Sequence, residues 1–128
     1  MVKQVSPRVG EDVLDIGTGS GEPALTIARL VAPVGRVTGI DLSERMIETA
    51  EQASRSSDLP NATFKVMDAE ALDLPDGCFD LAVSRFGFQI FTNPERAARE
   101  ALRVLKPAAR LGLRYGALLT KFLRCTLW

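Results

Sequence analysis

The chain has 128 residues, of which 46% are hydrophobic and 25% charged, and its 16 basic side chains balance 16 acidic ones. This composition is typical of one ordinary globular domain and excludes disordered, collagen-like and disulfide-rich classes. The sequence has no histidine, the commonest general base and zinc ligand, and no apolar run near the roughly 20 residues of a membrane-spanning helix. We expect one cytoplasmic domain over residues 1–128, with no metal site and no membrane span.

The first half of the chain alternates predicted strands and helices. A strand at 12–16 precedes a helix at about 23–31, and a strand at 36–40 precedes a second helix. Ser43 is a suitable N-cap for that helix, which ends near residue 56. Apolar residues recur at helical spacing. The residues expected on the buried stripes are Leu25, Ala28, Val31, Met46, Ile47, Ala50 and Ala53.

The second half continues the alternation. Strands are predicted at 62–67, 79–84 and 110–115. A helix begins at 93–95, where asparagine, proline and an acid combine an N-cap, a first-turn proline and a favourable dipole. It should end at Lys106–Pro107, and its expected inward residues are Ala98, Ala101, Leu102 and Leu105. Alternating strands and helices predict a parallel sheet covered on both faces.

The strongest local signal is the turn after the first strand, where Asp15 precedes Gly17, Gly19 and Gly21. Glycines at a strand-to-helix turn let a ligand approach bare backbone, although a glycine triplet alone is more often a tight turn. The dinucleotide fingerprint requires a small residue where this chain has Glu22. The spacing therefore disfavours a nicotinamide cofactor.

Acidic residues also follow the next two strands. Asp41 comes after the second strand, about 20 residues beyond the glycine turn, and Asp68 comes after the third. Either could be a simple turn residue. Ligands of open parallel sheets bind outside the carboxyl ends of the strands, so acids at three successive strand ends predict a binding site there.

With this acid-x-Gly-x-Gly-x-Gly turn and these two downstream acids, the chain resembles the class I S-adenosylmethionine-dependent methyltransferases, especially those acting on small molecules such as quinone precursors. The resemblance extends from about Val13 to Pro107. It implies a Rossmann-like α/β fold with strand order 3-2-1-4-5, S-adenosylmethionine as cofactor and a small-molecule methyl acceptor. A cationic sulfonium and ammonium tolerate the acids of the turn, whereas a pyrophosphate would not.

The resemblance also implies residue roles. Asp41 would accept both ribose hydroxyls, with Leu42 and Met46 near the adenine, while Asp68 and the Ala69 N–H would meet the adenine edge. The end of the fourth strand would flank the transferred methyl. The complete expected cofactor set is Asp15, Gly17, Thr18, Gly19, Gly21, Asp41, Leu42, Met46, Asp68, Ala69, Ser84 and Arg85. No catalytic residue is assigned.

Three aromatic residues, Phe86, Phe88 and Phe91, follow the fourth strand, and core packing is a better explanation for them than substrate stacking. Methyl transfer from a sulfonium depends mainly on alignment and exclusion of water, so the lack of histidine is compatible with it. O- or C-methylation would then need an acceptor that ionises readily, or a carboxylate or tyrosine base.

The sequence departs from the family pattern near both ends. Only about ten residues precede the first strand, where the family has helices, and Ala108–Ala109 replace two glycines. The tail over 113–128 is atypical. It can be drawn as a helix with Leu118, Leu119, Phe122 and Leu123 apolar, or as an end produced by truncation or an altered reading frame. We expect the family's final hairpin to be absent, so the fifth strand is an exposed edge unless the tail covers it or a second chain does so in a homodimer.

Charge and cysteine content suggest no other partner. Residues 1–94 hold 8 Lys/Arg and 14 Asp/Glu, whereas 95–128 hold 8 and 2. Arg96, Arg99 and Arg103 fall on the polar face of a predicted helix, which favours a solvated face over nucleic-acid binding. Cys78 and Cys125 are interpreted as free thiols.

Three functions fit the sequence, in this order: a small-molecule methyltransferase, a non-catalytic cofactor-binding fragment or module without an acceptor pocket, and a nicotinamide dehydrogenase. The third is disfavoured by Glu22 and by the absence of a proton relay.

Overall fold

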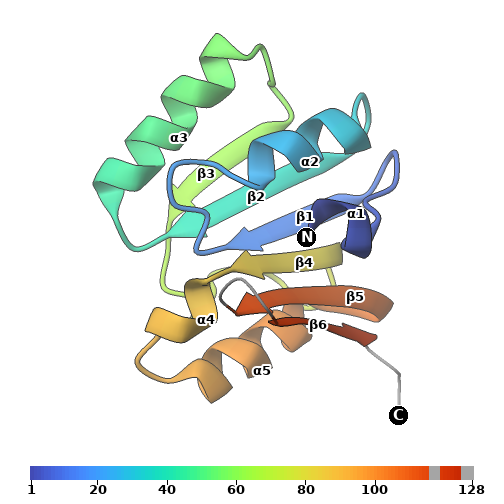
Figure 1. Ribbon diagram of the computed structural model, residues 1–128, viewed down its shortest axis with the longest axis vertical. Helices are drawn as coiled ribbons and strands as arrows, with labels where there is room; N and C mark the ends of the chain where they lie inside the picture. Colours follow the sequence, from blue (N-terminus) through green and yellow to red (C-terminus); the bar gives the residue numbers. More distant parts are fainter. Residues whose placement is uncertain (116–118, 125–128) are drawn as a thin grey trace.

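The computed structural model describes residues 1–115 and 119–124, which form a six-stranded sheet with helices on both faces (Figure 1). The strands are β1 (Asp12–Ile16), β2 (Arg36–Asp41), β3 (Ala62–Val66), β4 (Phe79–Arg85), β5 (Leu105–Tyr115) and β6 (Leu119–Arg124). The helices are α1 (Val2–Val5), α2 (Ala24–Val31), α3 (Glu44–Ser56), α4 (Gly87–Ile90) and α5 (Pro94–Val104). The short helices α1 and α4 were not predicted.

The sheet order is β3-β2-β1-β4-β5-β6, so the predicted parallel order 3-2-1-4-5 is confirmed. Strand β1 is central and pairs with β2 on one side and β4 on the other. The chain reverses its direction of travel across the sheet at this point. The carboxyl ends of β1 and β4 therefore border the crevice where open α/β sheets bind ligands.

Two hydrophobic cores lie on opposite faces of the sheet. Helices α2 and α3 cover one face and α5 covers the other (Figure 1). Successive β1 residues supply both cores, since Val13 joins the first and Leu14 the second. The predicted caps are confirmed: Ser43 Oγ accepts from Met46 N at 3.3 Å and Asn93 Oδ1 accepts from Arg96 N at 3.1 Å.

The connection from β3 to β4, residues 67–78, contains no helix or strand. Several of its apolar side chains pack on the same core as α5, namely Met67, Ala69, Leu72, Leu74 and Cys78. This segment therefore takes the place of a crossover helix on that face of the sheet.

Two predicted buried stripes need correction. On α5 the buried residues are Ala97, Ala101 and Val104, whereas Leu102 is exposed. The other predicted residues, Ala98, Ala101 and Leu105, do pack on the core of this face, although Leu105 already belongs to β5, so only Leu102 is misplaced. On α3, Met46 is also exposed, because it projects beyond the sheet edge into the ligand crevice.

The sheet continues beyond the fifth strand, because the tail covers it, which is one of the two ways of covering this edge that the sequence left open. Strand β6 pairs with β5 in antiparallel register from Arg110–Arg124 to Tyr115–Leu119. A strand rather than the helix drawn from the sequence therefore occupies 119–124, and β5 is not an exposed edge. Residues 116–118 and 125–128, including Leu118 and Cys125, lie outside the described part of the chain.

Strand β5 begins at Leu105 rather than at the predicted Arg110, and its pairing with β4 shifts register between Phe79 and Leu81. Ala108 lies in this irregular stretch with φ +61°, whereas Ala109 has no positive φ. Of the two alanines that replace family glycines, only Ala108 needs the left-handed conformation. No helix in the described ranges is both long and apolar enough to cross a membrane.

Candidate functional site

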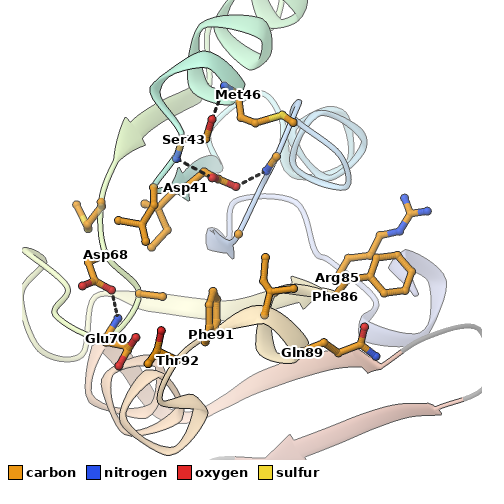
Figure 2. A pocket seen from close by; sticks show the side chains of 18 residues that line it. Asp41, Ser43, Met46, Asp68, Glu70, Arg85, Phe86, Gln89, Phe91 and Thr92 are labelled. Carbon is orange, nitrogen blue, oxygen red and sulfur yellow. Dashed lines mark hydrogen bonds between the residues drawn. The ribbon is translucent and has the colours of Figure 1, made fainter.

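A cavity of about 480 Å³ opens at the carboxyl ends of β1, β2, β3 and β4 (Figure 2). The predicted site residues that line it are Gly17, Gly19, Asp41, Leu42, Met46, Asp68, Ala69 and Arg85. Four other predicted residues, Asp15, Thr18, Gly21 and Ser84, are buried behind its wall. The residues predicted from the sequence therefore gather at the edge of the sheet where this cavity opens.

The glycine turn forms the floor beside β1. Gly17 has φ +72°, and a Cβ there would lie 3.3 Å from the Cα of Gly87, so the turn and α4 approach closely. The N–H groups of Gly17 and Thr18 both donate to the Ile40 carbonyl, at 2.9 and 2.8 Å. These bonds fasten the turn to the end of β2, so its backbone is already ordered without a ligand.

Asp41 makes the third connection of this turn. Its Oδ2 accepts from Gly19 N at 3.0 Å, and its Oδ1 accepts from Ser43 N at 2.9 Å (Figure 2). Three consecutive N–H groups of the turn therefore have acceptors within the protein. The carboxylate retains further lone pairs toward the cavity, because each oxygen can accept more than one hydrogen bond.

Asp15 is fully buried beneath the turn. Thr18 Oγ1 donates to its Oδ2 at 2.7 Å, while Oδ1 has no hydrogen-bond partner among the residues that the structure describes. Burial raises the pKa of Asp15 to about 7, with smaller contributions from the negative charges of Glu22 and Asp41. Two groups lower the pKa of Asp15 and so oppose the effect of burial: the Thr18 hydroxyl and the nearby Ala24 N–H. The Ala24 N–H does not form a hydrogen bond to Oδ1.

The β3–β4 segment supplies another wall. Asp68 is exposed at its start, and its Oδ1 accepts from Glu70 N at 2.9 Å (Figure 2). Ala69 is buried between the two. The carboxylates of Asp41, Asp68 and Glu70 thus border one part of the cavity, where they can accept hydrogen bonds from hydroxyl and amino groups.

The opposite part of the cavity is formed by the end of β4 and by α4 (Figure 2). Ser84 Oγ donates to the Ile16 carbonyl at 2.8 Å, so this hydroxyl joins β4 to β1 behind the wall. The Arg85 guanidinium lies 5.3 Å from the ring centre of Phe86. This arrangement is an apolar surface with a cation at its edge.

The three aromatic residues divide between two environments. Phe88 is buried in the core, as predicted. Phe91 packs against the same core, as predicted, but also lines the cavity, whereas Phe86 lines the cavity without belonging to that core. Phe91 also packs edge-on against Phe88, with ring centres 5.1 Å apart. The unpredicted helix α4 causes this division, because it places successive side chains in different directions.

Sequence reasoning missed several cavity residues, most of them on or beside α4: Glu70, Gly87, Gln89, Ile90 and Thr92. Gly87 has a clear structural reason, since a Cβ there would lie 2.5 Å from Ser84 Oγ and 3.1 Å from the Ile16 carbonyl oxygen. Four residues are too few for helical periodicity to reveal. The glycine itself was the only available signal.

The described residues contain no cluster of three or more metal-ligating side chains. The cavity offers carboxylate acceptors, the neutral polar side chains of Ser43, Gln89 and Thr92, apolar side chains and the Arg85 guanidinium at its edge. A polar, uncharged or cationic ligand with an apolar portion fits this arrangement better than a polyanion.

Comparisons with known proteins agree with this geometry. Residues 13–108 match the family model described as a methyltransferase domain. The chain is 37% identical over 114 residues to the 2-phytyl-1,4-naphtoquinone methyltransferase of Nostoc sp., covering 88% of this chain and 49% of that protein.

Two solved structures are also similar. An S-adenosylmethionine-dependent methyltransferase from Aquifex aeolicus has a TM-score of 0.83 at 29% identity, covering 88% of this chain and 60% of that one. The [4+2]-cyclase SpnF has a TM-score of 0.81 at 35% identity, covering 88% and 41%. The chain spans between 32% and 49% of the length of the first curated relatives that it matches.

Proposed function

Since the chain belongs to the methyltransferase-domain family of class I S-adenosylmethionine-dependent enzymes, we propose that it binds S-adenosylmethionine and transfers the methyl group to a small-molecule acceptor. The cavity at the carboxyl ends of β1–β4 is the proposed site.

The hydrogen bonding of the glycine turn carries this proposal. A dinucleotide needs free N–H groups at such a turn to hold its pyrophosphate. Here Gly17, Thr18 and Gly19 donate to acceptors within the protein, and one of those acceptors is the Asp41 carboxylate. A nucleoside cofactor with hydroxyl groups and a cationic centre suits these surroundings, whereas a pyrophosphate does not.

Different residues of the cavity would bind different parts of S-adenosylmethionine. Asp41 would accept from the ribose hydroxyls, and Asp68 and Ala69 would meet the adenine edge, as the family resemblance implies. Leu42 and Met46 line the cavity where they could pack on the base. The buried residues behind the wall, Asp15, Thr18, Gly21 and Ser84, would shape the turn rather than touch the cofactor.

The bound cofactor would supply an electrophilic methyl group on its sulfonium. The protein would hold the acceptor in line with that methyl and exclude water, which can contribute roughly 7–11 kcal/mol to rate acceleration. With no histidine in the chain, O- or C-methylation needs an acceptor that ionises readily, or a carboxylate or tyrosine base. Of the three carboxylates lining the described cavity, Glu70 is the one without a proposed role in holding the cofactor.

We propose an acceptor of the quinol or phenol class, which rests on relatives named as quinone methyltransferases. Such acceptors are aromatic and ionisable. The apolar surface of Phe86 and Phe91, with Arg85 at its edge, is chemically suited to an aromatic ring that carries a developing negative charge.

A second candidate function is cofactor binding without methyl transfer. The observation that favours it is the exposure of apolar side chains around the cavity, where Leu42, Met46 and Ile90 are 67%, 45% and 82% exposed. An acceptor pocket has to be closed and dry to accelerate transfer. The similar [4+2]-cyclase is named for another reaction, which makes direct measurement of turnover necessary.

The deciding experiment has two stages. Titration calorimetry with S-adenosylhomocysteine and NAD tests the site first, and binding of the former with no binding of the latter supports it. Tighter binding of NAD would refute the proposal. Methyl transfer from labelled S-adenosylmethionine to a panel of quinols and phenols then separates the enzyme from the binding module.

A further inference from the structure

The β3–β4 segment, residues 67–78, lines the cavity through Met67, Asp68, Ala69 and Glu70. It has no regular secondary structure, so the strand and helix bonding that orders the other walls does not order this one. Irregular segments with few backbone bonds open locally at low free-energy cost unless other groups restrain them. The arrangement of segment 67–78 therefore depends on groups elsewhere in the protein that bind it.

The side chain of Arg103, in the last turn of α5, makes three bonds to the segment. Its Nη1 donates to the Leu74 carbonyl at 2.9 Å and to Asp76 Oδ1 at 2.6 Å, and its Nη2 donates to the Leu72 carbonyl at 2.9 Å. Arg103 Nε donates to Glu100 Oε2 at 2.6 Å. Glu100 Oε1 in turn accepts from Leu72 N at 2.9 Å.

This pair therefore satisfies both backbone groups of Leu72. The guanidinium is planar and has five N–H donors in fixed directions, so it can bond several carbonyls and a carboxylate simultaneously. A lysine ammonium on a flexible stem cannot reproduce that arrangement. The backbone of α5 continues the attachment, since the carbonyls of Arg103 and Val104 accept from Gly77 N at 3.0 Å and Cys78 N at 2.8 Å.

The held residues lie directly after the cavity wall. Ala71 N donates to the Asp68 carbonyl at 3.1 Å, so a single turn connects Asp68 to Leu72. A restraint applied at Leu72 consequently fixes the turn that carries the two residues expected at the adenine edge.

We propose that Arg103, supported by Glu100, is a positioning residue for cofactor binding, holding segment 67–78 so that Asp68 and Ala69 face the cavity. This inference rests on the proposed function for the identity of the cofactor. Arg103 does not line the cavity, so its effect on binding is exerted entirely through the segment.

The first test measures amide hydrogen exchange of the full chain without any ligand. Arg103→Gln should accelerate exchange in 67–78, most clearly at Leu72, while Lys106→Gln should not. Lys106 is a matched control because its side chain is similarly part-exposed, and its ion pair joins Asp80 of β4 at 3.0 Å rather than Leu72, Leu74 or Asp76. Arg103→Lys should resemble Arg103→Gln, because the positive charge of lysine does not replace the several N–H donors of the planar guanidinium.

The second test measures affinity for S-adenosylhomocysteine by calorimetry. If the segment is in the competent arrangement only about a tenth to a fifth of the time in Arg103→Gln, affinity falls about five- to tenfold. The loss should disappear largely when combined with Asp68→Ala, because both changes remove the same wall, and it should add to that of Asp41→Ala. Glu100→Gln is a second variant, to be used if Arg103→Gln folds poorly. Because it keeps Arg103, it should lower the affinity by a smaller factor.

Unchanged exchange in 67–78 for both Arg103 variants would overturn the inference, as would a fall in affinity equal to that of Lys106→Gln. Full additivity with Asp68→Ala would also overturn it. If the wild-type chain fails to bind S-adenosylhomocysteine, the proposed function fails by itself, and the exchange result alone decides whether Arg103 restrains the segment.

Discussion

Asp41 both accepts hydrogen bonds from the backbone and lines the cavity. Both of its oxygens accept backbone N–H groups, from Gly19 and Ser43, yet the carboxylate still borders the cavity. The family resemblance implies that Asp41 binds the ribose hydroxyls. The structure adds a supporting role, because this carboxylate also orders the glycine turn.

We expect Asp41→Ala to weaken binding of S-adenosylhomocysteine by about 1.5–3 kcal/mol, the typical contribution of hydrogen bonds to a charged group. It should also lower the free energy of unfolding without ligand by about 1 kcal/mol, because Gly19 and Ser43 lose an acceptor. Calorimetry and urea unfolding measure the two effects. Asp73→Ala, at an exposed acid outside the cavity, is the control, and unchanged affinity in Asp41→Ala would leave Asp41 with only a structural role.

Asp15 makes stability depend on pH. Its pKa of about 7 in the folded chain lies above the ordinary 3.8 because the carboxyl is buried. Folding therefore favours the protonated form, so the stability that this group contributes is present below about pH 4 and is lost as the pH rises through 7.

Asp15→Asn should abolish this loss, because the amide is neutral at every pH and its oxygen can still accept from Thr18. The variant should exceed the wild type in unfolding free energy at pH 8 and approach it at pH 5. A shift of about three pKa units sets an upper limit of about 4 kcal/mol on the difference. Urea unfolding without ligand across pH 5–8 measures it, and parallel profiles for the two proteins would contradict the assignment.

At the scale of elements, sequence patterns located every strand and helix longer than four residues within described residues 1–115, because periodicity and caps are local signals. What they missed depends on three-dimensional context. The antiparallel pairing of β6 with β5 is a long-range choice, and α4 is a single turn whose glycine is fixed by contacts with Ser84 and Ile16. The sequence therefore predicted the cavity residues that follow the ends of strands, but not those on or beside α4.

The entry to β5 contains an avoidable strain. Ala108 is exposed with φ +61°, a conformation that costs a residue with a Cβ roughly 1–2 kcal/mol. Ala108→Gly should therefore raise the free energy of unfolding by about 1 kcal/mol, after the greater flexibility of glycine in the unfolded chain is allowed for.

Ala109→Gly is the matched comparison. Ala109 is buried and has no positive φ, so glycine there removes a packed methyl group and adds unfolded-state entropy without relieving strain. We expect destabilisation by about 1 kcal/mol. Urea unfolding of both variants should therefore give opposite signs, and the same sign for both would show that the backbone at Ala108 is not strained.

At the scale of the whole molecule, the two ends of the sheet differ. The carboxyl ends of the strands carry the cavity, and four exposed apolar side chains gather around it. They are Leu42 directly after β2, Met46 on α3, Phe86 between β4 and α4, and Ile90 on α4. We call these four residues the apolar rim. Exposed apolar groups that cluster in this way mark interaction sites in soluble proteins. Because β6 covers β5, this rim replaces the β5 edge as our expected surface for self-association.

Ile90→Ser should weaken self-association of the chain, because Ile90 is 82% exposed at this rim and burying its side chain between two copies would contribute roughly 1.5–3 kcal/mol. Val34→Ser is the control: Val34 is 76% exposed, but it precedes β2 at the opposite end of the sheet. Light scattering and sedimentation over a concentration series should show a dissociation constant raised about tenfold or more by Ile90→Ser and unchanged by Val34→Ser. Equal effects of the two substitutions would mean that association follows general surface hydrophobicity, and a wild-type chain that stays monomeric at high concentration would show that the rim does not bring copies together.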